Sequence, residues 1–163
     1  MKKVILGATG SIGSSLAKKL VDSGEQVHLV GRDEASLSEL ANELNSTFTT
    51  CDVLEENFSE KIINDLKDEQ VNGLAYCVGS IDLKPLKLTK KSDFMQSFNL
   101  NLVSAAEIIK SLADNLKTNK GSIVLFSTVA VQQGFPNHAI VSSAKGAVEG
   151  LTLALAAEYA PNI

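Results

Sequence analysis

The sequence has 163 residues, 44% of them hydrophobic, and a formal net charge of −4, which suits one domain with a substantial core. The mild negative charge and the absence of a basic run argue against a nucleic acid as partner. We find no apolar stretch that approaches the roughly 20 residues needed to cross a bilayer, and the first predicted strand begins too early for a signal peptide, so we expect a cytoplasmic protein with no membrane partner.

Hydrophobic patterning predicts strands and helices that alternate along the chain. In the first helix, Ile12, Leu16 and Leu20 recur every four residues, and Gly24 is a suitable stop. Asp33 can cap the second helix. In chain order, we predict a strand at Val4–Leu6, a helix at Ser11–Ser23, a strand at Gln26–Val30, a helix at Glu34–Leu44, a strand at Thr47–Cys51, a weaker helix at Phe58–Lys67, a strand at Gly73–Val78, a long helix at Asp93–Lys117 capped by Ser92, a strand at Ser122–Ser127 and a helix at Ser142–Tyr159.

Strands thus alternate with helices five times, and the first, fourth and fifth strands read as continuous apolar runs. These features predict an α/β fold in which helices cover both faces of a parallel sheet. Ligands of such sheets bind beyond the carboxyl ends of the strands. We therefore expect one crevice to be lined by the residues at those ends, which are Gly7, Arg32, Asp52, Gly79 and Thr128.

The glycine-rich stretch Gly7–Gly13, written GATGSIG, joins the first strand to the first helix. Glycines let the backbone approach an anion and turn sharply, and the first helical turn directs unpaired N–H groups at that anion. We predict that the stretch holds the pyrophosphate of a dinucleotide; the alternative is a tight turn with no ligand. The residues placed at the cofactor are Gly7, Thr9, Gly10, Ser11 and Ile12.

Two side chains at strand ends suit the adenosine half of such a cofactor. Arg32 can pair with a ribose 2′-phosphate, whereas an acid at this position would accept a hydrogen bond from the 2′-hydroxyl. This favours NADP(H), with NAD(H) still possible because Asp33 adjoins Arg32; an exposed Arg with no ligand is the alternative. Asp52 could accept from the adenine amino group or could cap a turn.

Three polar residues in the second half of the chain are candidates for chemistry. Asn101 lies in a long apolar helix, where a buried amide needs partners, although Asn99 is close enough that the pattern does not choose between them. Lys145 lies in the first turn of the last predicted helix, where a cation opposes the dipole unless an anionic cofactor or ribose offsets it. His138 could transfer a proton near neutral pH, or could be an exposed loop residue.

The two cysteines, Cys51 and Cys77, each fall near the end of a predicted strand. Their spacing is not that of a metal site, and thiols of cytoplasmic proteins stay reduced. We therefore expect two buried, reduced thiols and no bound metal.

Together these residues resemble the short-chain dehydrogenase/reductase family over nearly the whole chain. The most specific part is Ser143–Thr152, written SAKGAVEGLT. The resemblance implies a Rossmann-type, doubly wound parallel sheet in three layers, a single NAD(P)-binding domain over residues 1–163, and hydride transfer between NAD(P)(H) and a small-molecule carbonyl or alcohol. It also implies that the C-terminal part of the family fold lies outside the given chain. The further positions that it places at the cofactor are Val53, Cys77, Gly79 and Lys145.

The sequence departs from the family at the active site, which usually holds Asn, Ser, Tyr and Lys. Asn101 and Lys145 match, but Val141 stands four residues before Lys145, where the family has its Tyr. Valine has no proton to give, so we expect His138 to be the donor. Thr128 falls at the Ser position, and the glycine spacing of three then three resembles atypical members. The predicted catalytic set is Asn101, Ser127, Thr128, His138 and Lys145.

Three functions stay open on these grounds: an NADP(H)-dependent oxidoreductase with a replaced acid, a non-catalytic NAD(P)-binding sensor or scaffold, and an epimerase or dehydratase using the same cofactor site. The helices predicted at residues 93–117 and 142–159 have apolar faces wider than one sheet contact needs. We expect a homodimer or homotetramer through these helices; burial inside a larger single chain is the alternative.

Overall fold

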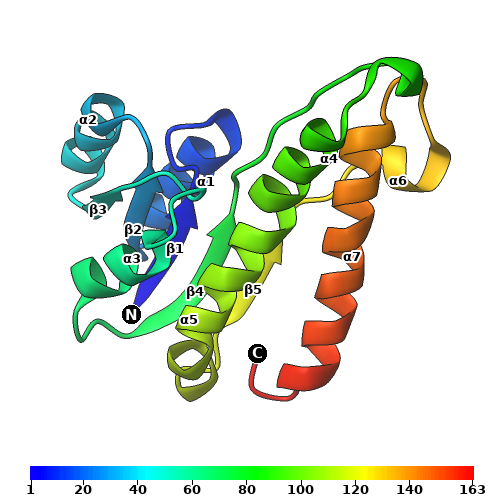
Figure 1. Ribbon diagram of the computed structural model, residues 1–163. Helices are drawn as coiled ribbons and strands as arrows, with labels where there is room; N and C mark the ends of the chain where they lie inside the picture. The colour runs from blue at the N-terminus through cyan, green and yellow to red at the C-terminus, as the bar shows by residue number, and fades with distance from the viewer.

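Five parallel strands form one sheet in the computed structural model, which describes residues 1–163 (Figure 1). Their spatial order is β3-β2-β1-β4-β5, so the chain starts in the middle, winds to one edge and then crosses to the other. All four strand pairings are parallel, which confirms the predicted doubly wound α/β sheet. The strands are β1 (Lys2–Leu6), β2 (Gln26–Gly31), β3 (Thr47–Thr50), β4 (Val71–Tyr76) and β5 (Ser122–Leu125).

Helices cover both faces of this sheet and give it three layers (Figure 1). Apolar side chains of α1 and α2 pack on one face, and those of α3 and α5 pack on the other. Asp33 caps α2 as predicted, since its side chain accepts the Ala35 N–H. The helices are α1 (Ser11–Asp22), α2 (Glu34–Leu44), α3 (Phe58–Leu66), the 3₁₀ turn η1 (Leu86–Leu88), α4 (Lys91–Phe98), the π-helix η2 (Asn99–Val103), α5 (Ser104–Thr118), α6 (Ala130–Gln133) and α7 (Ala139–Tyr159).

Burial along the strands follows their place in the sheet. The central strand β1 is fully buried at Val4, Ile5 and Leu6. The prediction that the fifth strand is covered on both faces is wrong, because β5 is an edge strand and its Val124 is 47% exposed. An apolar run therefore marks a strand here without showing whether it is central.

The long helix predicted at residues 93–117 is interrupted. It begins at Lys91 rather than after a Ser92 cap, because the Asp93 carboxylate accepts the backbone N–H of Lys90 at 2.8 Å. A π-helix, η2, then separates α4 from α5. The apolar periodicity continues through the interruption, so the sequence pattern does not reveal it.

The last helix begins three residues earlier than predicted, at Ala139. Ile140 and Val141 are buried, and this burial outweighs the weak helix propensity of β-branched residues. Lys145 consequently lies in the second turn of α7 rather than the first, which weakens the argument from the helix dipole. The fifth strand also stops at Leu125 rather than Ser127, and the short helix α6 that follows was not predicted.

The helix α7 also corrects the expectation about apolar stretches. It has 21 residues, and an 18-residue window within it has a mean hydropathy of 1.3, so its length and composition would allow it to cross a membrane. Only 22% of that window is buried. This criterion is weak for a single helix, because core helices of globular proteins meet it too. In the fold, α7 packs against α4 and the π-helix η2 (Figure 1).

Candidate cofactor and active site

A cavity of about 710 Å³ opens at the carboxyl ends of the central strands. Four of the five predicted strand-end residues line it, and Thr128 does not. Ser11, Ile12 and Lys145 lie outside the lining, and the Ile12 side chain points outward with 54% exposure. The predicted cofactor residues that do line the cavity are Gly7, Thr9, Gly10, Arg32, Asp52, Val53, Cys77 and Gly79.

The glycine-rich loop is shaped by close backbone contacts. Gly7 has a φ of +75°, and a Cβ there would lie 3.0 Å from the Cys77 carbonyl, so only glycine is free of strain at this position. A Cβ on Gly13 would lie 2.3 Å from the Gly7 oxygen. The loop therefore folds back on the first turn of α1 at van der Waals distance, which requires glycine at both ends.

The first turn of α1 has no protein group to cap it. Gly10 occupies the cap position without a side chain, and the turn contains no acidic residue. The free N–H groups and the positive end of the helix dipole thus face the loop unopposed. This arrangement fits a bound phosphate or pyrophosphate group.

The adenosine end of the cavity is defined by Arg32, Asp33 and Asp52. The Arg32 side chain is 76% exposed and lies 3.5 Å from an Asp52 carboxylate oxygen, while the other Asp52 oxygen accepts the Leu54 N–H. Asp52 therefore caps a turn, as one of the two sequence interpretations proposed. The hydrogen bond from the Ser36 hydroxyl lowers the pKa of Asp33, whose carboxylate also accepts the Ala35 N–H. Because the Asp33 carboxylate accepts hydrogen bonds from the first turn of α2, Arg32 is the side chain that could contact a ribose substituent.

Both cysteines are free, Cys51 buried and Cys77 half-buried. Burial raises the pKa of each thiol to about 11, so both are protonated at neutral pH. Cys77 belongs to the cavity wall, and its backbone N–H donates to the Leu6 carbonyl at 2.9 Å. These thiols serve packing rather than nucleophilic chemistry.

Asn101 and Lys145 meet at Gly79. Asn101 is 1% exposed, its amide nitrogen donates to the Ser97 carbonyl at 2.9 Å, and its Oδ1 has no partner. A Cβ built on Gly79 would lie 3.0 Å from that oxygen and 3.5 Å from the Lys145 Nζ. The choice between the two asparagines is settled by burial, because Asn99 is exposed.

Lys145 is a half-buried cation with no ion pair in the structure. Burial lowers its pKa, because the low-dielectric surroundings disfavour the charged form. The Lys145 ammonium group and the Asn101 amide oxygen thus lie close together beside Gly79, and neither has a hydrogen-bond partner there. This arrangement suits a hydroxyl-bearing ligand that can both donate and accept.

The remaining predicted catalytic residues form their own contacts around α6 and the start of α7. The Ser127 hydroxyl donates to Glu149, and the Thr128 hydroxyl accepts the Ala130 N–H at 3.3 Å. The His138 Nδ1 lies 2.8 Å from the Pro136 carbonyl. No hydrogen bond joins these three residues to Asn101 or Lys145. Val141, one helical turn before Lys145, is 3% exposed.

Further residues that line the same cavity were not predicted at the site: Val30, Gly31, Cys51, Leu54, Val78, Ser80, Gln96 and Leu100. Gln96 lies on α4 and Leu100 on the π-helix η2 that continues it, and their spacing of four places them on one face of the helix predicted from the sequence. That spacing was the one signal that could have identified them. Ser80 follows Gly79 directly and carried no separate signal.

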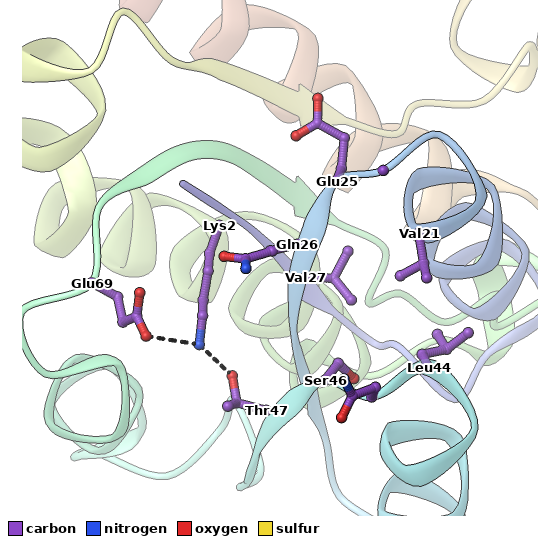
Figure 2. Close-up of a pocket in the computed structure, with 11 residues that line it drawn as sticks. Lys2, Val21, Glu25, Gln26, Val27, Leu44, Ser46, Thr47 and Glu69 are labelled. Carbon is purple, nitrogen blue, oxygen red and sulfur yellow. Dashed lines mark hydrogen bonds and ion pairs between the residues drawn. The ribbon is translucent and has the colours of Figure 1, made fainter.

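A second cavity of about 410 Å³ lies at the opposite, amino-terminal ends of β1, β2 and β3 (Figure 2). Lys2 projects into it, and its Nζ is held by the Thr47 hydroxyl at 2.8 Å and by Glu69 at 3.2 Å. No predicted cofactor or catalytic residue lines this cavity. The candidate site is therefore the cavity at the carboxyl ends.

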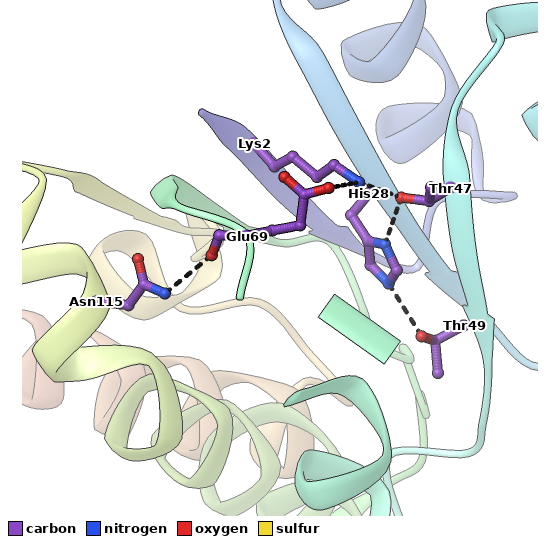
Figure 3. Close-up of polar contacts among 6 residues, drawn as sticks. All are labelled: Lys2, His28, Thr47, Thr49, Glu69 and Asn115. Carbon is purple, nitrogen blue, oxygen red and sulfur yellow. Dashed lines mark hydrogen bonds and ion pairs between the residues drawn. The ribbon is translucent and has the colours of Figure 1, made fainter. Parts of the chain in front are cut away.

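Behind that second cavity, His28 lies in a chain of side-chain hydrogen bonds (Figure 3). Its Nδ1 is 2.8 Å from the Thr47 hydroxyl and its Nε2 is 2.9 Å from the Thr49 hydroxyl. Thr49 donates to the Asp65 carboxylate at 2.7 Å, so Thr49 must accept from the His28 Nε2–H. Thr47 accepts from Lys2 and donates to the His28 Nδ1. The chain thus runs in one direction, from Lys2 to Asp65, and fixes a neutral imidazole.

Comparison with known proteins places this geometry in a family. Residues 7–163 match the family model described as enoyl-(acyl carrier protein) reductase. The chain is 31% identical to L-fucose dehydrogenase of Oryctolagus cuniculus, over 94% of this chain and 55% of that protein. It is 30% identical to L-xylulose reductase of Bos taurus, over 99% of this chain and 66% of that protein. The chain thus spans between half and two thirds of the length of these curated relatives.

Solved structures agree on the fold. A short-chain dehydrogenase/reductase family protein superposes with a TM-score of 0.92 at 24% identity, covering 99% of this chain and 69% of that one. A serine dehydrogenase from Escherichia coli superposes with a TM-score of 0.91 at 19% identity, covering 99% and 78%. At these identities the likeness establishes the Rossmann-type fold. With the family match over residues 7–163, it follows that the chain belongs to the short-chain dehydrogenase/reductase family of oxidoreductases.

Proposed function

We propose that the protein is an NADP(H)-dependent oxidoreductase that acts on a carbonyl or alcohol substrate and uses a proton donor other than Tyr. One observation carries the proposal: a single cavity joins the uncapped start of α1 and the exposed Arg32 guanidinium, which lies 3.5 Å from Asp52, to Gly79, where Asn101 and Lys145 meet. These groups suit, respectively, a pyrophosphate, a 2′-phosphate and a nicotinamide ribose.

When bound, the nicotinamide cofactor would supply or accept the hydride. The residues of the chain would bind, orient and manage protons. The loop Gly7–Gly13 would hold the pyrophosphate through backbone N–H groups, and Lys145 would donate to ribose hydroxyls. The hydrogen bond to Pro136 keeps a proton on the Nδ1 of His138 and leaves its Nε2 free. In its doubly protonated imidazolium form, His138 could pass the Nε2 proton to a substrate oxygen held by Thr128 or Ser127 and keep its Nδ1–H on the Pro136 carbonyl.

The cofactor preference is tested at Arg32. An Arg32→Ala variant removes the guanidinium and frees Asp52 from its 3.5 Å contact. We expect the variant to bind NADPH about tenfold more weakly, corresponding to one lost charge-assisted contact, and to bind NADH as before. Isothermal titration of both cofactors measures this. Equal losses for NADPH and NADH would show that Arg32 does not read the 2′-phosphate.

The proton donor is tested with the full-length protein, NADPH and a panel of carbonyl substrates. We expect His138→Ala to lower kcat by about a hundredfold, the usual effect of losing a general acid, with the NADPH affinity unchanged. Ser143→Ala, five residues after His138 on α7, is the control, since the Ser143 hydroxyl only bonds back to the Ala139 and Ile140 carbonyls. A normal rate in His138→Ala would remove His138 from the mechanism.

A second function, non-catalytic NAD(P) binding by a sensor or scaffold, is favoured by one observation. The buried side chain one turn before Lys145 is Val141, which is 3% exposed and carries no proton. This function predicts tight NADPH binding without turnover over the same panel. Gain of turnover in Val141→Tyr would then indicate an enzyme site that has lost its acid, and no gain would indicate a binding protein.

We propose a homodimer or homotetramer through residues 93–117 and 142–159, in the cytoplasm. Leu153 on α7 is 74% exposed and Val103, at the end of the π-helix, is 50% exposed. Little of α7 is buried in this structure, which also supports a partner subunit covering its outer face. A chain segment beyond residue 163 could cover this face instead, and light scattering of the full-length protein separates the two arrangements.

A further inference from the structure

The π-helix η2 leaves one backbone carbonyl without its usual helical donor. The Ser104 N–H bonds back five residues, to the Asn99 carbonyl, and widens the turn. The Leu100 carbonyl in this turn receives a hydrogen bond from outside the helix, from the Tyr76 hydroxyl at 2.7 Å. Tyr76 is the last residue of β4 and is 2% exposed. A strand side chain therefore satisfies the carbonyl that the π-turn displaces.

A second buried hydroxyl, that of Ser104, also forms hydrogen bonds at this turn. The Ser104 Oγ lies 2.9 Å from the Asn99 carbonyl and 2.8 Å from the Val53 carbonyl. Val53 belongs to the cavity wall at the adenosine end, and Leu100 belongs to the wall near Gly79. Neither Tyr76 nor Ser104 lines the cavity. The two hydroxyls thus hold the turn from behind the site.

The turn they hold carries Asn101. Its buried Oδ1, which has no partner, faces the same point beside Gly79 as the Lys145 Nζ. In a regular α-helix, the residues after Asn99 would be rotated and shifted along the axis, and the Asn101 amide would leave this position. Burial raises the pKa of Tyr76, so its hydroxyl keeps its proton and stays a donor at any physiological pH.

We propose that Tyr76 and Ser104 are positioning residues, whose hydroxyls maintain the π-turn and thereby hold the Asn101 amide against Gly79 and Lys145. The proposal rests on the proposed function for its effect on turnover, but its structural part stands without turnover. Both residues act through Asn101 and touch neither cofactor nor substrate.

The test uses Tyr76→Phe and Ser104→Ala, each of which removes only a hydroxyl. The first measurement is hydrogen exchange of the backbone amides at residues 99–105, with and without NADPH. We expect exchange in this segment to become about tenfold faster in each variant, the effect of one lost hydrogen bond, while α1 and α2 keep their protection. Unchanged exchange at residues 99–105 in both variants would overturn the proposal, whether or not the protein proves to be an enzyme.

The second measurement separates positioning from general stabilisation. On the best substrate of the carbonyl panel, we expect kcat to fall about tenfold with KM for NADPH within about twofold, because the lost contact lies outside the cofactor cavity. A fall in kcat that merely follows a lower melting temperature, or that is matched by a rise in KM, would overturn the positioning role.

Matched controls exist for both hydroxyls. Tyr159, the other tyrosine, lies over Lys117 and forms no hydroxyl hydrogen bond, so Tyr159→Phe should leave exchange at residues 99–105 unchanged. Ser111, on the same helix as Ser104, only donates back to the exposed Glu107 carbonyl, so Ser111→Ala should behave likewise. A control variant that loosened the turn as much as Tyr76→Phe would overturn the specific role of the two hydroxyls.

Discussion

Replacing Gly13 by Ala will reduce NADPH affinity by at least about tenfold, or 1.4 kcal/mol of binding free energy. The new Cβ would lie 2.3 Å from the Gly7 oxygen and 2.9 Å from the Ala8 Cα, both backbone atoms that no side-chain rotation can move away. The glycine-rich loop must therefore shift off the first turn of α1, which separates the backbone donors that face the phosphate. We also expect a loss of about 1–3 kcal/mol in the free energy of unfolding, typical of an overpacked site.

The matched control is Gly150→Ala, another glycine within a helix. A Cβ on Gly150 meets nothing within 4 Å, so the substitution replaces a poor helix former by a good one and should stabilise the fold by up to about 1 kcal/mol. Isothermal titration with NADPH and thermal unfolding of both variants measure these effects. Wild-type affinity in Gly13→Ala would show that the tight loop is a packing feature with no part in binding.

Acidification will destabilise the protein through His28. The pKa of His28 falls from 6.5 to about 4, mainly because the imidazole is buried; Lys2 on β1 acts in the same direction, and Asp65 on α3 and Glu69 after α3 partly oppose the shift. The unfolded chain therefore binds a proton on this imidazole between pH 6.5 and pH 4, while the folded chain does not. Stability is complete above pH 6.5 and falls by about 3 kcal/mol as the pH drops to 4.

The geometry explains why the folded state resists this proton. A proton on His28 Nδ1 would point at the Thr47 hydroxyl oxygen, which already accepts from the Lys2 ammonium. Denaturant unfolding at several pH values measures the effect. We expect His28→Gln to flatten the pH dependence between 6.5 and 4, and His138→Gln, at the other histidine, to retain the wild-type dependence. The same slope in His28→Gln as in the wild type would assign the loss of stability to other groups.

Much of the fold could be predicted because each element carries its own local signal. Apolar runs ended by Gly7, Arg32 and Gly79 located three strands to within three residues, and Asp33 marked the start of α2 at the residue where the structure places it. The alternation of strands and helices then required parallel pairing. What local signals could not give was the environment: β5 and β1 both read as apolar runs, but one is an edge strand and the other is central.

Site positions that depend on backbone conformation could be predicted, whereas those that depend on contacts between distant side chains could not. Part of the glycine loop and four of the five predicted strand-end residues line the cavity, as the topology predicts. The hydroxyls of Ser127 and Thr128 are engaged by Glu149 and Ala130, partners that the sequence pattern does not reveal. The π-turn around Asn101 depends on Tyr76, 25 residues earlier on another element, so no periodicity within the helix can signal it.

The uncapped start of α1 has a consequence for the energetics of the whole domain. Gly10 gives the first turn of α1 no side-chain contact, so an anion bound there would supply the acceptor that Asp33 supplies at the start of α2. An anion bound there adds RT ln(1 + [L]/Kd) to the stability of the folded state. Because α1 follows the central strand β1, an anion bound at this turn would stabilise the centre of the fold, and its concentration would shift the balance between folded and unfolded chains. If a dinucleotide binds at this turn, the stability of the protein would rise with the concentration of that ligand.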